Sequence, residues 1–213
     1  MPTRPDPPLV VRRRAGRVDL VLGNVVLLSS AALGTERAFG ALVPPEALRV
    51  VIGGLGFGAT LRGALDVLGP GARVVVVEKV AAIEPLLRGE LADLAAGGLD
   101  DPRVTLEHAD VEEVLARERG VDAILLDVDN GPEWASFRTN ARLYSPAGLA
   151  VASSALRPGG VFAVWSGYPA DGFLAQLRKA GFAPSVVPLR EKGVVRARAY
   201  VGVKPHGSLD SSR

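Results

Sequence analysis

Four acidic residues stand close to the ends of apolar, strand-like runs in the sequence. They are Glu78, Asp110, Asp127 and Asp129. A carboxylate can accept hydrogen bonds from ribose hydroxyls or from an exocyclic amine, hold an ammonium ion and take up its proton. Because the carboxyl ends of parallel strands meet at one edge of a sheet, these acids are candidates for one shared ligand site.

A glycine-rich turn precedes the first of these acids. The apolar run Val50–Ile52 breaks into a cluster of glycines, which are Gly53, Gly54, Gly56 and Gly58. Glycine lets the backbone turn sharply and approach a ligand closely, and the helix that follows offers free N–H groups. Glu78 lies about 20 residues beyond the last glycine, a spacing that suits binding to ribose hydroxyls. Glycines also make ordinary tight turns, but the flanking strands and the acid favour a nucleotide site.

These residues need a sheet to hold them, and strand-like and helix-like segments alternate between residues 46 and 205. We predict strands at 49–52, 73–77, 103–107, 123–126, 161–165, 185–189 and 196–203 and helices at 60–68, 81–96, 112–118, 146–156 and 172–180. This alternation predicts an α/β fold with a doubly wound, mostly parallel, Rossmann-like sheet.

The N-terminal segment has a different character. Residues 1–14 are rich in proline and arginine, and we predict a disordered basic arm. Two apolar runs around Gly23–Asn24 predict a short β-hairpin, and a helix capped by Thr35 is expected over 35–42. We therefore expect the arm, then the hairpin and helix at 15–45, the sheet domain at 46–205 and a frayed tail at 206–213.

Composition narrows the chemistry. The chain of 213 residues has a formal net charge of +2 and contains no cysteine, which excludes disulfides, thiolate catalysis and cysteine metal sites. The small net charge, and the lack of aromatic residues among Arg12, Arg13 and Arg14, disfavour nucleic-acid binding. The sequence has no run as long as a membrane span and no signal-peptide core, so we expect a cytoplasmic protein without a membrane partner.

In this order, the residues resemble class I S-adenosylmethionine-dependent transferases, and most closely the spermidine/spermine synthase family. The likeness runs from about Val18 to Val203. The glycine turn is similar to the family's nucleoside-binding loop, and LDDPRVTLEHAD to the segment that leads to its adenine-contacting aspartate. AILLDVDNGPEW resembles the catalytic loop. The resemblance implies an adenosyl-binding transferase of the aminopropyltransferase type.

The resemblance also implies roles for single residues. Glu78 would bind the ribose hydroxyls and Asp110 the adenine amine, although Asp110 also suits the cap of the following helix. Asp127 or Asp129 would hold an acceptor amine and take its proton. Three residues of the same region would line the acceptor pocket, namely Asn130, Trp134 and Tyr144.

The donor implied is S-adenosylmethionine or its decarboxylated form, and the acceptor is a small-molecule amine. No metal is needed, because a sulfonium is already a strong leaving group. The resemblance further implies a homodimer.

The chain departs from the family's pattern at positions where the family has acidic or polar residues that bind the polyamine. The second half of the glycine turn, Leu55–Gly58, has no acid. The second catalytic aspartate falls at Asn130, unless Asp129 has taken its place. The family's polyamine-binding glutamine and tyrosine–histidine pair have no counterparts, and Glu36 and Arg37 occur there instead.

These departures leave two alternatives. One is a small-molecule methyltransferase that uses S-adenosylmethionine, and the other is a nucleoside-binding relative without catalysis. A nicotinamide-binding Rossmann protein fits the HAD and LDVDN segments poorly.

Overall fold

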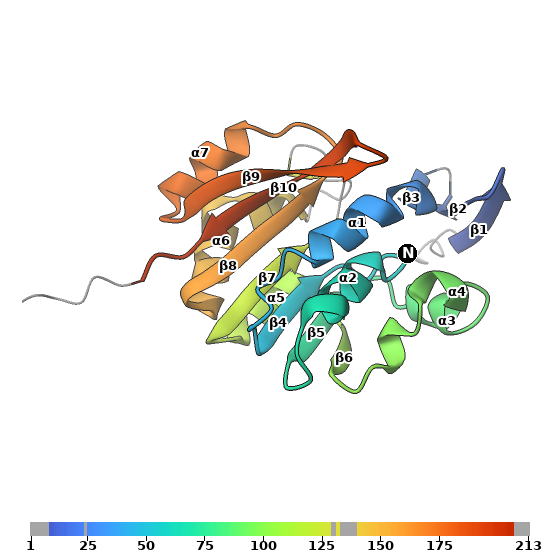
Figure 1. Cartoon of the computed structure of the whole chain (residues 1–213), viewed down its shortest axis with the longest axis horizontal. Coiled ribbons are helices and arrows are strands. Elements are labelled where there is room, and N and C mark those ends of the chain that lie inside the picture. Colours follow the sequence, from blue (N-terminus) through green and yellow to red (C-terminus); the bar gives the residue numbers. More distant parts are fainter. Residues whose placement is uncertain (1–8, 24, 129–130, 133–139, 207–213) are drawn as a thin grey trace, which may run out of the picture.

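The structure is a computed structural model that describes residues 9–23, 25–128, 131–132 and 140–206. Within these residues, a seven-stranded sheet lies between two layers of helices, and a three-stranded sheet adjoins it (Figure 1). The small sheet is formed by the N-terminal part of the chain.

The large sheet carries the candidate site at its carboxyl edge. Its strands are β4 (Arg49–Gly53), β5 (Arg73–Glu78), β6 (Val104–His108), β7 (Val121–Leu126), β8 (Leu156–Ser166), β9 (Ala183–Glu191) and β10 (Val194–Val203). In space they follow the order β6–β5–β4–β7–β8–β10–β9. The pairs among β4 to β8 are parallel, and β10 runs antiparallel to both β8 and β9. The predicted mostly parallel, Rossmann-like sheet is therefore confirmed. The order of the strands reverses between β4 and β7, and sheets of this kind bind ligands at that point.

Helices cover both faces of this sheet, so that each face has its own hydrophobic core. One layer contains α1 (Leu33–Gly40), α2 (Ala59–Val67), α3 (Ile83–Arg88) and α4 (Ala92–Ala95), and the other contains α5 (Val111–Arg117), α6 (Pro146–Ala155) and α7 (Gly172–Lys179). Strand residues alternate between the two cores: Val50 and Ile52 enter the first, and Val51 enters the second. Successive side chains of a strand point to opposite faces of the sheet, and here both faces are buried. The sequences of these strands are therefore nearly continuous apolar runs.

The N-terminal hairpin is confirmed, but it has a third strand. β1 (Leu9–Arg14), β2 (Arg17–Leu22) and β3 (Val25–Ser29) form an antiparallel sheet in this order. The prediction of a disordered arm was wrong for the residues of β1. Leu9 and Val11 pack against the first core, and Arg12 lies opposite Asp19 in the neighbouring strand with 3.2 Å between charged groups. The packing of these two apolar side chains and the ion pair outweigh the polar composition of the segment.

Two other local predictions were wrong. The helix expected over 81–96 is divided into α3 and α4, because Gly89 leaves the helical conformation after the first. Thr35 does not cap α1, which begins two residues earlier; its buried hydroxyl donates instead to the carbonyl oxygen of Ala32 at 2.9 Å.

The helices α1 and α2 cross at very short range. A Cβ atom on Gly40 would lie 2.0 Å from the carbonyl oxygen of Thr60, and one on Gly63 would lie 2.0 Å from that of Arg37. No side chain fits in either place. The two glycines therefore let the backbones touch and fix α1 above the start of α2, next to the carboxyl edge of the sheet.

We expect the substitution Gly63→Ala to destabilise the fold by about 2 kcal/mol or more, because the added methyl group forces the two helices apart. Guanidinium unfolding followed by circular dichroism measures the loss.

The matched control is Gly172→Ala at the start of α7, where a Cβ atom would meet nothing within 4 Å. This variant should stay within about 0.5 kcal/mol of the parent. Equal losses in the two variants would contradict the close-contact explanation.

Candidate functional site

The glycine turn lies at the carboxyl end of β4, between the ends of β5 and β7. The amide of Gly54 donates to the carbonyl oxygen of Val77 and the amide of Asp127 donates to that of Gly53, both at 2.8 Å. Gly54 has a φ of +91°, and a Cβ atom there would lie 2.2 Å from the carbonyl oxygen of Asp127. Glycine at this position therefore allows the turn and the loop after β7 to lie against one another.

Glu78 is bound to the glycine turn by its carboxylate. The side chain is buried, with a residue exposure of 7%. One carboxylate oxygen accepts the amide hydrogen of Leu55 at 2.9 Å, and the other accepts that of Val80 at 2.7 Å. Each oxygen keeps a second lone pair. The carboxylate thus shapes the turn and can still accept further hydrogen bonds.

Asp110 caps helix α5 and also pairs with a lysine. Its Oδ1 accepts the amide hydrogen of Glu112 at 3.0 Å, so the helix-cap interpretation is confirmed. Its Oδ2 accepts from Lys79 Nζ at 2.9 Å. Partial burial raises the pKa of Asp110, but these two hydrogen bonds outweigh that effect, so that the pKa is lowered overall. The contact with adenine stays a prediction.

Asp127 follows β7 and points toward the layer that contains α1 and α2. Leu125 belongs to the core on that side and Leu126 to the other core, so alternation assigns the next residue to the first side. The hydroxyl of Thr60, at the start of α2, lies 2.5 Å from Asp127 Oδ2. Burial raises the pKa of Asp127 to about 6, and the bond from Thr60 offsets only part of that effect.

Glu36 is a second acid at this place, and it was missed as a site residue in the sequence. Its backbone carbonyl oxygen lies 3.3 Å from the same Thr60 hydroxyl. Burial, together with the charge of Asp127, raises the pKa of Glu36 well above its ordinary value. The two carboxylates therefore influence one another across Thr60. Glu36 occurs where the family's polyamine-binding residues are missing, and this was the available signal.

The structure does not bring all predicted residues together. Tyr144 is buried in the core on the opposite face, where its ring meets that of Phe173 edge-on at 5.8 Å between centroids. This places it away from Asp127. Three predicted residues lie outside the described residues, namely Asp129, Asn130 and Trp134.

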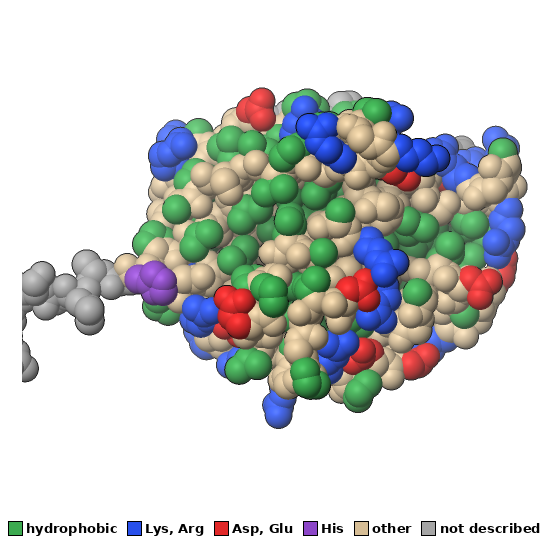
Figure 2. Space-filling view, in the orientation of Figure 1, with side chains coloured by type: hydrophobic (Ala, Val, Ile, Leu, Met, Phe, Trp, Pro, Cys, Tyr) green, Lys and Arg blue, Asp and Glu red, His purple; other side chains and the backbone are tan. Residues whose placement is uncertain are grey.

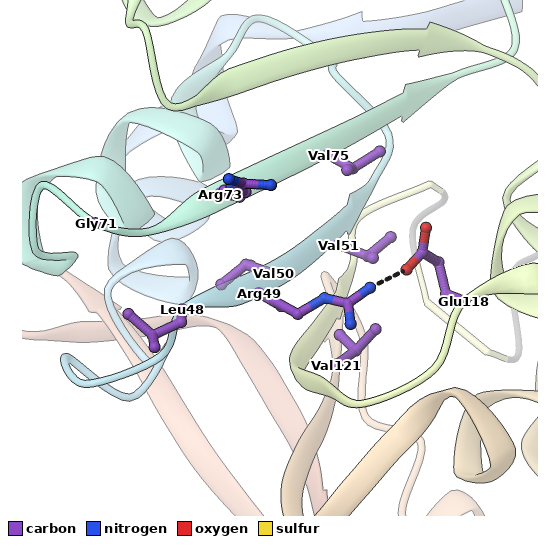
Figure 3. A pocket seen from close by; sticks show the side chains of 9 residues that line it. All are labelled: Leu48, Arg49, Val50, Val51, Gly71, Arg73, Val75, Glu118 and Val121. Atoms are coloured by element: carbon purple, nitrogen blue, oxygen red, sulfur yellow. Dashed lines mark hydrogen bonds and ion pairs between the residues drawn. The ribbon is translucent and has the colours of Figure 1, made fainter.

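A hollow of about 480 Å³ lies at the other end of the sheet. Its walls come from the amino ends of β4, β5 and β7 (Figure 3). Arg49 at its margin is paired with Glu118 at 2.9 Å. Since the candidate acids lie at the carboxyl ends of these strands, this hollow is separate from their site.

No group of three or more His, Cys, Asp or Glu side chains could hold a metal ion among the described residues. None of the helices described is long and apolar enough to cross a membrane.

The surface charge is mixed where Figure 2 shows it. Basic and acidic side chains lie interspersed on this face. Near the N-terminus, Arg13 is paired with Glu90 at 3.3 Å, and Arg12 is paired within its own sheet. The expected basic cluster is thus partly neutralised by the fold.

Comparisons with known proteins agree with this geometry. No protein-family model matches the chain. A polyamine aminopropyltransferase of Mycobacterium tuberculosis is 32% identical over 124 residues, which cover 52% of this chain and 22% of that protein. The chain therefore spans about a fifth of the length of the curated relatives that it matches.

Solved structures show the fold. Two spermidine synthases, one from Thermotoga maritima and one in complex with the transition-state analogue AdoDATO, match with TM-scores of 0.68 and 0.67. In both cases the identity is 19%, and the match covers 88% of this chain and 65% of the other. A 1,6-didemethyltoxoflavin-N1-methyltransferase of Burkholderia thailandensis, with bound S-adenosylhomocysteine, has a TM-score of 0.57 at 20% identity; this match covers 82% of the present chain and 80% of the methyltransferase.

The fold is thus that of class I S-adenosylmethionine-dependent transferases. The chain is similar to a polyamine aminopropyltransferase in sequence over about half of its own length and to spermidine synthases in fold over most of it.

The raised pKa of Asp127 has a consequence for stability. The folded protein holds this proton up to about pH 6, whereas the unfolded chain releases it near its ordinary value of 3.8. The contribution of this proton to folding is complete below pH 4 and is lost as the pH rises toward 6 and beyond.

We therefore expect Asp127→Asn to be more stable than the parent at pH 8, by on the order of 1–3 kcal/mol, and to lose less stability between pH 4 and pH 8. Thermal unfolding across this range measures both effects. The control is Asp93→Asn, which changes an exposed aspartate and should have the same stability as the parent at each pH. If Asp127→Asn also matched the parent at each pH, the burial of Asp127 would have no electrostatic cost.

Proposed function

We propose that this chain transfers an aminopropyl or related alkyl group from an S-adenosylmethionine-type donor to a small-molecule amine. The observation that carries the proposal is the half-buried carboxylate of Asp127, held by Thr60 directly beside the glycine turn. A base and a nucleoside-binding turn are thereby joined at the point where such sheets bind ligands. The similarity to aminopropyltransferases and spermidine synthases supports this assignment.

In this proposal, the donor lies along the ends of β4, β5 and β6. The turn Gly53–Gly58 meets its sulfonium tail, Glu78 accepts its ribose hydroxyls and Asp110 accepts its adenine amine. Two neighbours in fold hold AdoDATO and S-adenosylhomocysteine, which supports an adenosyl-sulfur ligand as the class. The chain's own residues suffice to bind such a donor without a metal.

The chemistry is a nucleophilic displacement. The amine nitrogen of the acceptor attacks a carbon bound to the sulfonium, the C–N bond forms, and the C–S electron pair returns to sulfur to leave a neutral thioether. The acceptor arrives as an ammonium ion, and Asp127 first accepts one of its protons, which frees the nitrogen lone pair for this attack. With a pKa raised to about 6, this carboxylate is a stronger base than an ordinary aspartate and is still ionised at neutral pH. Asp129 is the second candidate for this role.

A small-molecule methyltransferase is the alternative function. It is favoured by the lack of an acid in the second half of the glycine turn, where the buried Phe57 stands instead, with a residue exposure of 1%. The fold of the Burkholderia methyltransferase also supports it.

The deciding experiment offers the protein either decarboxylated or intact S-adenosylmethionine with a set of amines, and detects products by mass spectrometry. We expect an alkylated amine and methylthioadenosine from the decarboxylated donor. A methylated acceptor from the intact donor would establish the alternative. Calorimetric binding of methylthioadenosine without any product would indicate a nucleoside-binding protein that lacks catalysis.

We expect Glu78→Gln to weaken the binding of methylthioadenosine by about 10- to 100-fold. The amide loses the charge that the ribose hydroxyls would meet, and its NH₂ group would face the amide hydrogen of Leu55 or Val80. Isothermal titration calorimetry measures the change. The exposed Glu46, changed to Gln, serves as the control, and a Glu78→Gln protein with unaltered affinity would exclude this carboxylate from the donor site.

A homodimer in the cytoplasm completes the proposal. The homodimer rests on the resemblance to the aminopropyltransferases, and the location rests on the sequence features described above. Sedimentation equilibrium of the full chain tests the first, with a monomer as the contrary result.

A further inference from the structure

We propose that Glu36 determines the acceptor specificity of this site by binding, together with Asp127, the ammonium group of the acceptor. This inference rests on the proposed function and goes beyond it in assigning a residue and a charge state to the acceptor. Glu36 comes from α1, outside the glycine turn and outside the loop that follows β7.

The position of Glu36 is fixed by the fold. The contact between α1 and α2 is so close that Gly40 and Gly63 have no room for a side chain. This contact brings the backbone of Glu36 to 3.3 Å from the Thr60 hydroxyl, which lies 2.5 Å from Asp127 on its other side. The two acids are thus held near one another by the rigid part of the molecule.

Neither carboxylate has a cationic partner within the described part of the chain. The adjacent Arg37 is bound to Asp66 at 2.7 Å, on the outer side of the helices. Two acids that share a partly buried space repel one another, and each hinders the ionisation of the other. An ammonium ion between them would relieve this repulsion, because it supplies the missing positive charge and several N–H donors.

Trp165 gives an independent sign that this place receives a ligand. Leu126 pairs with Val164 in the sheet, and Asp127 and Trp165 are the next residues of these two segments. Trp165 belongs to the core on the same face as Leu125. Its exposure is 7%, yet its indole N–H has no hydrogen-bond partner among the described residues. Such a buried, unpaired donor is costly, and it indicates a polar ligand. The indole ring also suits a nearby cation.

The charges define the class of acceptor. Two carboxylates on the face of the sheet that also carries Trp165 favour an acceptor that arrives as a cationic amine and disfavour a neutral nucleophile of the same size. As one carboxylate releases its proton when the ammonium binds, amine binding should be coupled to proton release near neutral pH. Glu36 acts in binding, and Asp127 remains the group that accepts the proton from nitrogen during transfer.

The test uses calorimetry on the full chain saturated with methylthioadenosine. The probes are 1,4-diaminobutane, 1-aminobutane and the neutral 1-butanol, each titrated in buffers of different ionisation enthalpy. We expect both amines to bind about tenfold or more tightly than the alcohol and to release protons. Glu36→Gln should lose about tenfold or more of the amine affinity and most of the proton release, whereas its binding of methylthioadenosine should equal that of the parent.

The control variant is again Glu46→Gln, which removes an exposed carboxylate and should leave all three measurements unchanged. A Glu36→Gln protein that binds methylthioadenosine normally and keeps its amine affinity would overturn the inference, as would equal binding of amine and alcohol by the parent. Failure of the parent to bind methylthioadenosine would overturn the proposed function itself, and this inference with it. Thermal unfolding verifies that each variant is folded.

Discussion

The contact between α1 and α2 is the constraint on which the site depends. Without Cβ atoms at Gly40 and Gly63, the two helix backbones lie against one another, and α1 extends over the start of α2. Thr60 then stands between an acid of α1 and the acid after β7. A second close contact, between Gly54 and the carbonyl oxygen of Asp127, joins the nucleoside turn to the same place. Three separate segments thus meet through two close backbone contacts and through the hydroxyl of Thr60.

The site is electrostatically unfavourable for the empty protein. Burial raises the pKa values of Asp127 and Glu36, and the charge of Asp127 raises that of Glu36 further. On the same face, the buried indole N–H of Trp165 has no hydrogen-bond partner among the described residues. Groups of this kind are more often found where a ligand completes the arrangement than where stability alone is served. The charged residues elsewhere behave differently: Arg103, for example, pairs with Asp101 and holds the pKa of that carboxyl to about 2.

Much of this could be predicted from the sequence. The acids after the strands, the glycine turn and the sheet class all follow from local patterns of apolar and polar residues. The predictions that were wrong concern features that depend on contacts between residues far apart in the sequence. The residues of β1 have the composition of a disordered arm but pair with β2 as a strand. The sequence around Tyr144 gave no sign that this side chain faces the opposite core. The meeting of Glu36 with Asp127 depends on how two helices cross, and the spacing of two glycines on different helices shows this only once the fold is known.

The donor side of the proposed site comes from the sheet and the acceptor side comes from a helix, and this affects how such a protein could diverge in evolution. The donor side is built from strand ends whose backbones touch, so a side chain at position 54 would displace the loop that carries Asp127. On the acceptor side, Glu36 comes from α1, which packs against α2. Glu36 could therefore be exchanged with little effect on the nucleoside turn, whereas Gly40 of the same helix has no room for a side chain. New acceptors would be gained by altering a single helix, while the machinery for the donor is inherited unchanged.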